Sequence, residues 1–584
     1  TNLQTYVRRS NENVIHCVAF REKSWSVTAF SQPKGIRKLL SRLGVTATVA
    51  SLVIFIFLPS FFLISFTFTQ WPEVYTEVFA NPLIGDTNWI EIQKYVSLSI
   101  RLAVSAVAIG LVFGIPLAYI LARKNFWGKG FLEDITTFTL VIPTSGFGFA
   151  TLIAWTSIFG VDSIYLIPVI NVPFIMLVIH IALTFPYIVK TLKAKLEDMS
   201  TLFEQASGTL GSSPLTTFRK VILPLTLPAI FSGAVLAFAR SLGETGATLV
   251  VSSVYTTAPI AVIRWVSQFN FGAAAFLGSL LIIVATAIIL PIEFVLQKKG
   301  VSSFSIFSTL HIEKKLLKLE DFASRKLPRM RDVIVLLFII LVVVLPIIVV
   351  LNSVTLSWNS DPDTGKVTES VMYQLFGPSN YFSALLDATF VSFASAAIAT
   401  YIATCIAIPT VFLIKRYRFG RFLRAILRVP LIVPTSALGL SILLLWGPEG
   451  LNLANPGIWL IILTHIVFSV PVVVEPMLAT FEGSDIPLYE GASRTLGATQ
   501  YNTVESVSLP LLKRGILAGV ILSFTRSLGE TGATFLVMGS ATTIPPLVVN
   551  MVESLSIPAA LFASTYLIAI SFVLLMVFRK VTTR

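Results

Sequence analysis

Apolar residues along the chain gather into twelve stretches, which are separated by shorter polar segments. Each stretch has about 20 residues or more, the length that an α-helix needs to cross the roughly 30 Å hydrocarbon core of a bilayer. The stretches cover residues 46–66, 97–122, 136–158, 168–189, 224–250, 272–296, 333–355, 385–414, 425–447, 457–479, 510–537 and 561–578. The pattern predicts an all-α polytopic membrane protein with about twelve transmembrane helices.

Lysine and arginine concentrate in alternate connections between these stretches. The basic connections precede the odd-numbered stretches and include Arg37, Lys38, Arg123, Lys124, Lys129, Lys190, Lys193, Arg219, Lys220, Lys314, Lys315, Arg416 and Arg418. The other connections hold few cations and carry acidic residues such as Glu73, Glu77, Asp361 and Asp363. Because Lys and Arg are retained on the cytoplasmic side, we expect a cell-membrane protein with both termini in the cytoplasm.

Composition supports a membrane protein and gives no sign of nucleic-acid binding, a disulfide or a metal site. Of the 584 residues, 55% are hydrophobic and only 12% are charged, against about 25% charged in soluble domains. The net charge of +13 is spread over membrane-flanking segments and not over one patch, so we expect no nucleic-acid binding. Cys17 and Cys405 lie in unlike contexts and predict no disulfide. No His or Cys cluster has the spacing of metal ligands.

The second half of the chain repeats the first. Residues 204–262 and 490–548 align without a gap and are identical at 29 of 59 positions. Shorter repeats are the octapeptide Ser241–Thr248 at Ser527–Thr534, Pro143-Thr144-Ser145 at Pro434-Thr435-Ser436, and His180 with Pro186 at His465 with Pro471. Since each half has six stretches, the halves should share one orientation and be related by a pseudo-two-fold axis along the membrane normal.

This repeat divides the chain into four parts. We expect a polar cytoplasmic tail at 1–40, a first transmembrane domain at 41–299, a cytoplasmic linker at 300–332 and a second transmembrane domain at 333–584. The tail has no apolar core before Thr46 and is not typical of a cleavable secretory signal.

A duplicated cytoplasmic loop separates the fourth and fifth stretch of each half. Its marked residues are Glu204, Gln205, Ala206, Ser207, Gly211, Leu223 and Pro224 in the first copy and Glu490, Gly491, Ala492, Ser493, Gly497, Leu509 and Pro510 in the second. Leu202, Phe203, Ala206 and Leu210 would share one face of a short helix. Gly211 can take the left-handed conformation that ends this helix, and Pro224 suits the first turn of the next one. The pattern predicts a short helix outside the membrane whose apolar face has no partner in this chain; the alternative is a purely structural amphipathic loop.

The loop resembles the EAA loop of type I binding-protein-dependent ABC importer permeases, in which Glu-Ala-Ala is followed by Gly, nine residues and Ile-X-Leu-Pro. The triplet departs from that pattern, since it is Gln205-Ala206-Ser207 and Gly491-Ala492-Ser493, each with a Glu one place upstream. The resemblance implies that the loops dock on an ABC ATPase homodimer at the cytoplasmic face. It also implies that an extracytoplasmic substrate-binding protein binds the opposite face.

Nucleotide chemistry is expected in the partner and not in this chain. The phosphate-binding sequence Gly-X4-Gly-Lys-Ser/Thr does not occur in the sequence, so there is no sign of the usual phosphate-binding loop. We therefore expect ATP and Mg in the partner ATPase, and neither a cofactor nor a catalytic site in this chain. No carboxylate pair or nucleophile with an adjacent base suggests an enzyme.

Polar residues in the fifth stretch of each half are the candidate translocation pathway: Arg240, Glu244, Thr245, Thr248, Arg526, Glu530, Thr531 and Thr534. An ionisable group inside a membrane helix is costly and usually faces a cavity or a partner. Each Arg stands four positions before its Glu, so the two could instead pair within one helix. Both interpretations stay open. His180 and His465 are expected to form hydrogen bonds within the bundle, and Pro143 and Pro434 to kink the third span of each half.

Two features bear on the transported solute. The segment around Glu244 is similar to the Ala-Leu-Gly-Glu-Phe-Gly-Ala stretch of sulfate and molybdate permeases, with Thr245 and Thr531 in place of Phe. This similarity favours a small inorganic oxyanion such as molybdate, tungstate or sulfate. The fusion of two halves is instead similar to permeases for ferric iron, thiamine or aminoethylphosphonate. A secondary transporter driven by an ion gradient is the alternative from another class, but it would not need twin cytoplasmic loops.

Overall fold

The structure, a computed structural model, describes residues 34–80, 85–298, 317, 320–321, 328–362 and 364–583. Most of the expected tail, with Cys17, and most of the expected linker at 300–332 lie outside these residues. The chain forms two compact units, residues 1–49 and residues 50–584. In the first unit, the described residues belong to helix α2, Lys34–Leu52. All contacts described below lie within the second unit.

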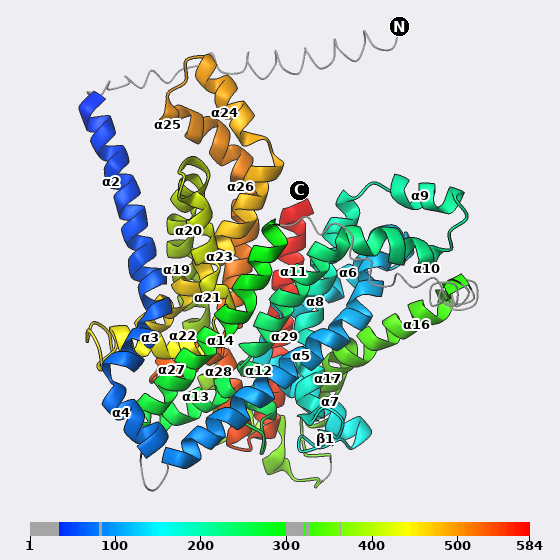
Figure 1. Cartoon of the computed structure of the whole chain (residues 1–584). Coiled ribbons are helices and arrows are strands. Elements are labelled where there is room, and N and C mark those ends of the chain that lie inside the picture. Colours follow the sequence, from blue (N-terminus) through cyan, green and yellow to red (C-terminus); the bar gives the residue numbers. More distant parts are fainter. Residues whose placement is uncertain are drawn as a thin grey trace. The chain divides into compact units, whose positions relative to one another are not determined.

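Helices make up nearly all of the described structure of the first half (Figure 1). After α2 come η1 (Val53–Phe57), α3 (Leu58–Thr69), α4 (Trp71–Tyr75), η2 (Thr76–Ala80), α5 (Gly85–Arg123), α6 (Lys129–Val141), α7 (Thr144–Phe159), β1 (Leu166–Ile167), β2 (Val172–Pro173), α8 (Phe174–Asp198), α9 (Leu202–Thr209), α10 (Pro214–Thr217), η3 (Phe218–Ile222), α11 (Leu223–Leu242), α12 (Gly246–Val251), α13 (Ala258–Ser267) and α14 (Phe271–Lys298). Strands β1 and β2 form a short antiparallel hairpin.

The second half repeats this order without a strand pair among its described residues. It contains α16 (Pro328–Ile339), η4 (Ile340–Val344), α17 (Leu345–Leu356), η5 (Val367–Glu369), α18 (Val371–Phe376), α19 (Tyr381–Arg416), α20 (Gly420–Leu427), α21 (Val429–Ile432), α22 (Thr435–Trp446), α23 (Ile458–Gly483), α24 (Ile486–Thr495), α25 (Gln500–Thr503), η6 (Val504–Ser508), α26 (Leu509–Leu528), α27 (Gly532–Val537), α28 (Ile544–Glu553) and α29 (Ile557–Thr583). The prediction of an all-α polytopic membrane protein is therefore confirmed.

Among the described residues, ten helices are long and apolar enough to cross a membrane, and two bent helix pairs bring the number to twelve. The bends measure 113° between α6 and α7 and 101° between α21 and α22. Each bend lies at a proline of the repeated Pro-Thr-Ser motif, where Ile142 and Val433 take extended backbone conformations. A residue that precedes proline is biased away from helical conformation, so the expected kinks are complete breaks.

The predicted stretches at 224–250 and 510–537 are not continuous helices, which corrects that expectation. Helix α11 ends at Leu242 and α12 starts at Gly246, while α26 ends at Leu528 and α27 starts at Gly532. Glycine has a low helix propensity because it loses much backbone entropy, and the repeated octapeptide has two glycines three residues apart. Glu244 and Glu530 therefore lie in breaks between helices and not inside a helix.

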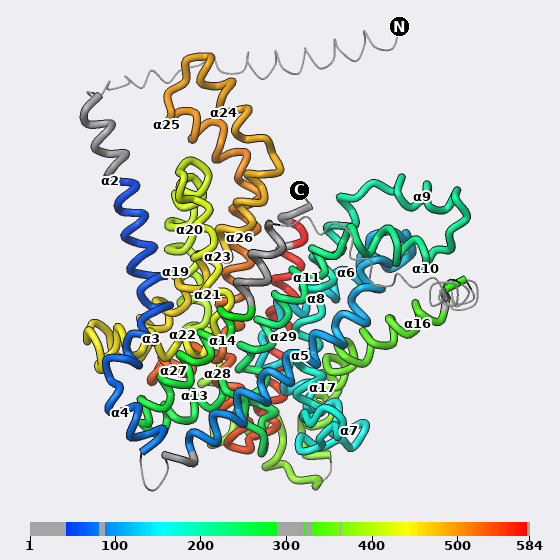
Figure 2. Tube along the Cα trace, viewed as in Figure 1, coloured from blue at the N-terminus to red at the C-terminus, as the bar shows by residue number. Residues whose placement is uncertain are grey.

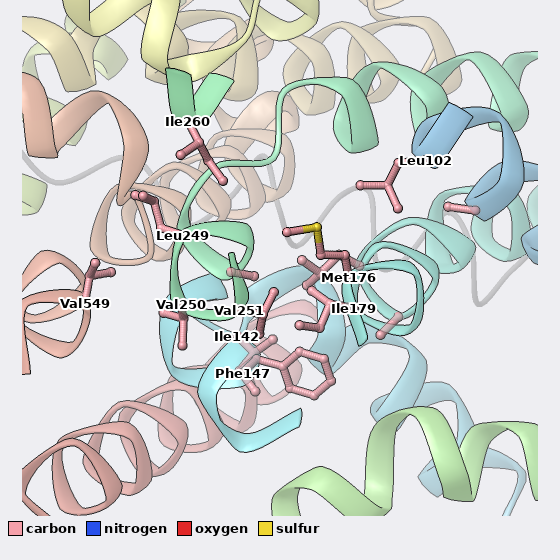
Figure 3. Packing of buried hydrophobic residues seen from close by; sticks show 14 of the residues in the cluster. Leu102, Ile142, Phe147, Met176, Ile179, Leu249, Val250, Val251, Ile260 and Val549 are labelled. Atoms are coloured by element: carbon pink, nitrogen blue, oxygen red, sulfur yellow. The ribbon is translucent and has the colours of Figure 1, made fainter. Parts of the chain in front are cut away.

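Helices of the two halves pack across each other. Helix α3 of the first half contacts α22 of the second, and α17 of the second half contacts α7 of the first (Figure 2). The hydrophobic core is continuous across both halves. Figure 3 shows part of it: Ile142 and Phe147 lie beside Val250 and Val251 of α12, near Met176 and Ile179 of α8. This packing holds α12, which follows the break after Leu242, against α7 and α8.

Candidate functional site

Two short helices outside the apolar spans match the predicted loops. Helix α9 follows α8 and α24 follows α23, and both lie at the same end of the helices as the end of α29 (Figure 1). Gly211 and Gly497 have φ angles of +81° and +87°, the left-handed conformation that ends a helix. Pro224 and Pro510 stand in the first turn of α11 and α26. The predicted local structure of these residues is confirmed.

The apolar faces of both short helices are open to the surroundings. Leu202, Phe203 and Leu210 are 68%, 50% and 87% exposed, and α9 has no buried residue. Leu488 and Leu496 at the second helix are 71% and 88% exposed. Gln205, Ala206, Gly491 and Ala492 are exposed as well, while Leu223 and Leu509 are half-buried where the next helices begin. Exposed apolar surface outside the membrane spans is typical of interaction sites.

The two motif glutamates face their own chain. Glu204 accepts a hydrogen bond from Nε of Arg123 at 2.7 Å, and Glu490 accepts one from Arg416 at 3.0 Å and one from Ser508 at 2.5 Å. Arg123 and Arg416 are the last residues of α5 and α19. The carboxylates therefore tie each short helix to the end of a long one, and they are not available at the outer surface.

The motif serines add a second attachment. Ser207 lies 2.9 Å from the hydroxyl of Thr217 and Ser493 lies 3.4 Å from the hydroxyl of Thr503. Both threonines belong to the turn that leads into the next long helix. Each short helix is therefore fixed on both sides, to the preceding and to the following span.

The break between α11 and α12 meets the equivalent break between α26 and α27 of the other half. A Cβ atom on Gly246 would lie 2.4 Å from Oγ1 of Thr531, and one on Gly532 would lie 2.6 Å from Cβ of Thr245. The contacts are reciprocal, as a two-fold relationship between the halves requires. The two copies of the motif thus close against each other where the halves meet.

The broken third spans line the same contact. A Cβ atom on Gly243 would lie 3.1 Å from Pro434 of the other half, and one on Gly529 would lie 3.3 Å from Pro143. Three buried hydroxyls near the breaks have no hydrogen-bond partner in the described part of the chain: Ser145, Ser436 and Thr531. Buried polar groups are normally paired, so these hydroxyls leave hydrogen-bonding capacity beside the contact between the halves.

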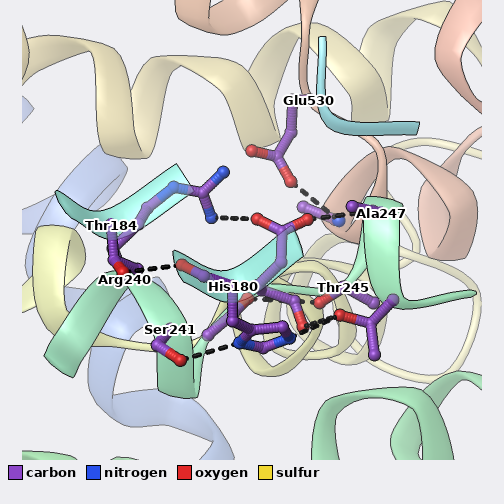
Figure 4. Close-up of polar contacts among 11 residues, drawn as sticks. His180, Thr184, Arg240, Ser241, Thr245, Ala247 and Glu530 are labelled. Carbon is purple, nitrogen blue, oxygen red and sulfur yellow. Dashed lines mark hydrogen bonds and ion pairs between the residues drawn. The ribbon is translucent and has the colours of Figure 1, made fainter. Parts of the chain in front are cut away.

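The charged residues at the two breaks are paired differently. Arg240 forms an ion pair with Glu244, which also accepts a hydrogen bond from the backbone N–H of Ala247 at 3.0 Å (Figure 4). Glu530 accepts the equivalent bond from Ala533 at 3.3 Å, but Arg526 has no ion pair within 4.0 Å among the described residues. Pairing within one segment, one of the two interpretations left open by the sequence, is thus present among the described residues in the first half only.

A buried histidine bridges each break. His180 lies 2.7 Å from Ser241 before the break and 3.0 Å from Thr248 after it. Figure 4 shows the contact between His180 and Ser241. His465 makes the same two contacts with Ser527 at 2.5 Å and Thr534 at 2.9 Å. The expected hydrogen bonds of both histidines within the bundle are confirmed. Thr248 and Thr534, proposed from the sequence as pathway residues, are partners of these histidines.

Known proteins with a similar sequence are transport permeases. The family model of the binding-protein-dependent transport system inner membrane component matches residues 110–299. The molybdenum transport system permease protein of Haemophilus influenzae is 36% identical over 159 residues, which cover 26% of this chain and 69% of that protein. The chain belongs to this family of ABC importer permeases. The sulfate transport system permease protein of Salmonella typhimurium is 31% identical over 197 residues (32% of this permease, 71% of that protein), and a probable sulfate permease of Chlorella vulgaris is 28% identical over 227 residues (36% and 85%).

One contact of the permease was not predicted from its sequence. Glu320, in the expected linker, forms an ion pair with Arg219 of η3 and accepts a hydrogen bond from Thr216 of α10 at 2.8 Å. Burial raises the pKa of the Glu320 carboxyl, but the hydrogen bonds from Arg219 and Thr216 outweigh this effect and hold the pKa below its usual value. Glu320 is thus attached beside the first short helix.

The described part of the permease has no cluster of three His, Cys, Asp or Glu side chains that could hold a metal ion. Cys405 is an exposed free thiol.

Proposed function

We propose that this permease is the transmembrane subunit of an importer that carries a small inorganic oxyanion such as molybdate, tungstate or sulfate into the cell. Several relatives are permeases for molybdenum, molybdate/tungstate or sulfate. The repeated Gly-Glu-Thr-Gly-Ala-Thr segment, which is similar to a segment of such permeases, lies where the two halves meet. The unpaired hydroxyls of Ser145, Ser436 and Thr531 are donors suited to the oxygen atoms of an oxyanion.

The observation that carries the proposal is the pair of exposed, firmly anchored helices α9 and α24. Their apolar faces would fill clefts on two copies of a separate ABC ATPase, and this docking would bury residues such as Leu210 and Leu496. Lys and Arg of the basic connections lie at the same end of the spans as α9 and α24. This end would therefore face the cytoplasm, and both termini would be on the cytoplasmic side. An extracytoplasmic binding protein would deliver the anion at the opposite end.

The anchoring gives a route for mechanical coupling. The ion pairs of Glu204 with Arg123 and of Glu490 with Arg416 connect each docking helix to the end of a long span. When ATP brings the two ATPases together, α9 and α24 would move together and carry these spans with them. The contact between Gly246 and Thr531 would then open and close as the halves rock about their common axis. In this mechanism the permease itself catalyses no reaction and holds no cofactor, because ATP and Mg belong to the ATPase.

The test is uptake of radiolabelled molybdate, tungstate and sulfate into proteoliposomes that contain the permease, the cognate ATPase and the cognate binding protein. We expect uptake of at least one oxyanion, dependent on ATP inside the vesicle and on the binding protein. A control with an ATPase variant that binds but does not hydrolyse ATP should show no uptake. Uptake of ferric iron, thiamine or a phosphonate alone would contradict the assigned substrate class, and uptake driven by an ion gradient without the ATPase would contradict the mechanism.

A further inference from the structure

The two breaks have identical sequences but unequal charge pairing. Residues Ser241–Thr248 and Ser527–Thr534 are the same octapeptide, and each is preceded by an arginine. Arg240 pairs with Glu244 in the first half. In the second half, the guanidinium of Arg526 lies over the ring of Phe468, 5.2 Å from its centre. A difference between identical segments must come from residues outside them.

Phe468 accounts for the position of Arg526. The fourth spans align through His180 with His465, and in this alignment the position of Phe468 is held by Leu183 in the first half. An aromatic face attracts a guanidinium through its quadrupole, and the attraction is stronger when the pair is shielded from water. Leucine offers no such attraction. Arg526 is thus held on the aromatic ring, whereas Arg240 is left to the carboxylate four residues later.

The carboxylate of Glu530 is engaged elsewhere. It accepts the N–H of Ala533 and lies within electrostatic range of Arg240 of the other half, and Figure 4 shows Glu530 beside Arg240. Two carboxylates therefore lie beside Arg240, and Arg526 has no counter-ion within 4.0 Å among the described residues. Its Nε is buried and has no hydrogen-bond acceptor there. A partly buried cation without a charged partner is costly, and a bound anion would reduce this cost.

We propose that the guanidinium of Arg526 is a binding contact for the oxyanion within the permease; this inference rests on the proposed function. Arg526 lies in the last turn of α26, just before the contact between the two halves, on the side of the docking helices. A guanidinium offers planar N–H donors that match two oxygen atoms of one oxyanion and keeps its charge at any physiological pH. The anion would first pass between Thr245 and Thr531, where the two halves meet. It would then reach Arg526 on the cytoplasmic side of that contact.

The test compares variants of the complete importer in proteoliposomes, with the oxyanion among molybdate, tungstate and sulfate that the wild type takes up best. The readout is the number of anions taken up per ATP hydrolysed, because a merely structural defect lowers both rates together. Arg526→Gln should lower this ratio about tenfold or more, the effect of losing a hydrogen bond to a charged group. Arg526→Lys, which keeps the charge but not the planar pair of donors, should restore part of the ratio.

Two further variants separate Arg526 from its surroundings. Phe468→Leu gives the second half the residue of the first half, and it should release Arg526 toward Glu530 and lower the ratio without removing any charge. Arg240→Gln removes the guanidinium that is already paired, and it should lower the ratio less than Arg526→Gln does. An unchanged ratio in Arg526→Gln, or equal losses in the two arginine variants, would overturn this inference alone. Absence of oxyanion uptake by the wild type would overturn the proposed function instead.

Discussion

Gly246 of the first half lies directly against Thr531 of the second half, so that a Cβ atom on this glycine would come within 2.4 Å of the threonine hydroxyl oxygen. Real Cβ atoms do not approach other atoms so closely. The same relation holds in reverse between Gly532 and Thr245. Glycine is required at both positions because the other half of the chain lies directly against them. In this structure the two halves are therefore closed on each other.

Substitution of these glycines should therefore prevent closure. Gly246→Ala or Gly532→Ala should lower the stability of the closed arrangement by about 1–3 kcal/mol, the usual cost of overpacking. Thermal unfolding of the purified permease should shift downward, and ATP-dependent uptake should fall. Gly483→Ala is the matched control, because no atom lies within 4 Å of its added Cβ. Equal unfolding temperatures in Gly246→Ala and Gly483→Ala would show that the contact is not tight.

The ion pair of Arg123 with Glu204 should hold α9 in its docking position. Both side chains are mostly buried, with 12% and 18% exposed, so the pair is shielded from the screening that weakens surface pairs. Glu204→Gln should weaken the attachment by about 1.5–3 kcal/mol, the value of a hydrogen bond to a charged group. Backbone amides of residues 202–209 should then exchange hydrogen faster, and ATP hydrolysis should respond less to the binding protein.

Charge reversal provides the control for this attachment. Arg123→Glu and Glu204→Arg should each loosen α9, and the double variant should restore part of the protection. If exchange in residues 202–209 were the same in wild type and Glu204→Gln, the carboxylate would not anchor the helix.

The linker contact at Glu320 should depend on pH. Its pKa is lower in the folded permease than in the unfolded chain, so its contribution to stability is fully present above the unfolded value of about 4.3. The contribution is lost as the pH falls through the lowered pKa. The difference in unfolding temperature between wild type and Glu320→Gln should thus be greatest near neutral pH and shrink in acid. A difference that stays constant from pH 7 to pH 3 would contradict this attachment.

The sequence predicted most of the spans and the two short helices α9 and α24 because both follow from local rules. Twenty apolar residues must cross a bilayer as a helix, and Gly211 and Pro224 end and begin helices through their own backbone preferences. Partners distant in sequence could not be predicted in the same way. Arg123 lies 81 residues before Glu204, and no spacing rule connects them.

The breaks after α11 and α26 also could not be predicted from local sequence. Gly243 and Gly246 weaken a helix, but glycine also occurs in continuous membrane helices, so the break could not be predicted from these residues alone. The unequal pairing of Arg240 and Arg526 accompanies differences in another helix, among them Phe468 in place of Leu183. The arginines before two identical octapeptides can therefore have different partners. The structure shows that Arg240 pairs with a carboxylate and that Arg526 lies on an aromatic ring.

In the proposed mechanism, α9 and α24 are the contacts that connect this permease to a separate ATPase. Leu210→Asp and Leu496→Asp change side chains that are 87% and 88% exposed, so the fold of the permease should be unaffected. Since burial of a leucine contributes about 1.5–3 kcal/mol, each variant should weaken binding of the cognate ATPase about tenfold or more. Val169→Asp, at a residue 94% exposed beside the β-hairpin, is the matched control and should bind normally. The deciding measurement is the affinity of the ATPase for the permease carrying both loop substitutions: we predict that binding and ATP-dependent uptake are lost, and unchanged binding with unchanged uptake would contradict the account.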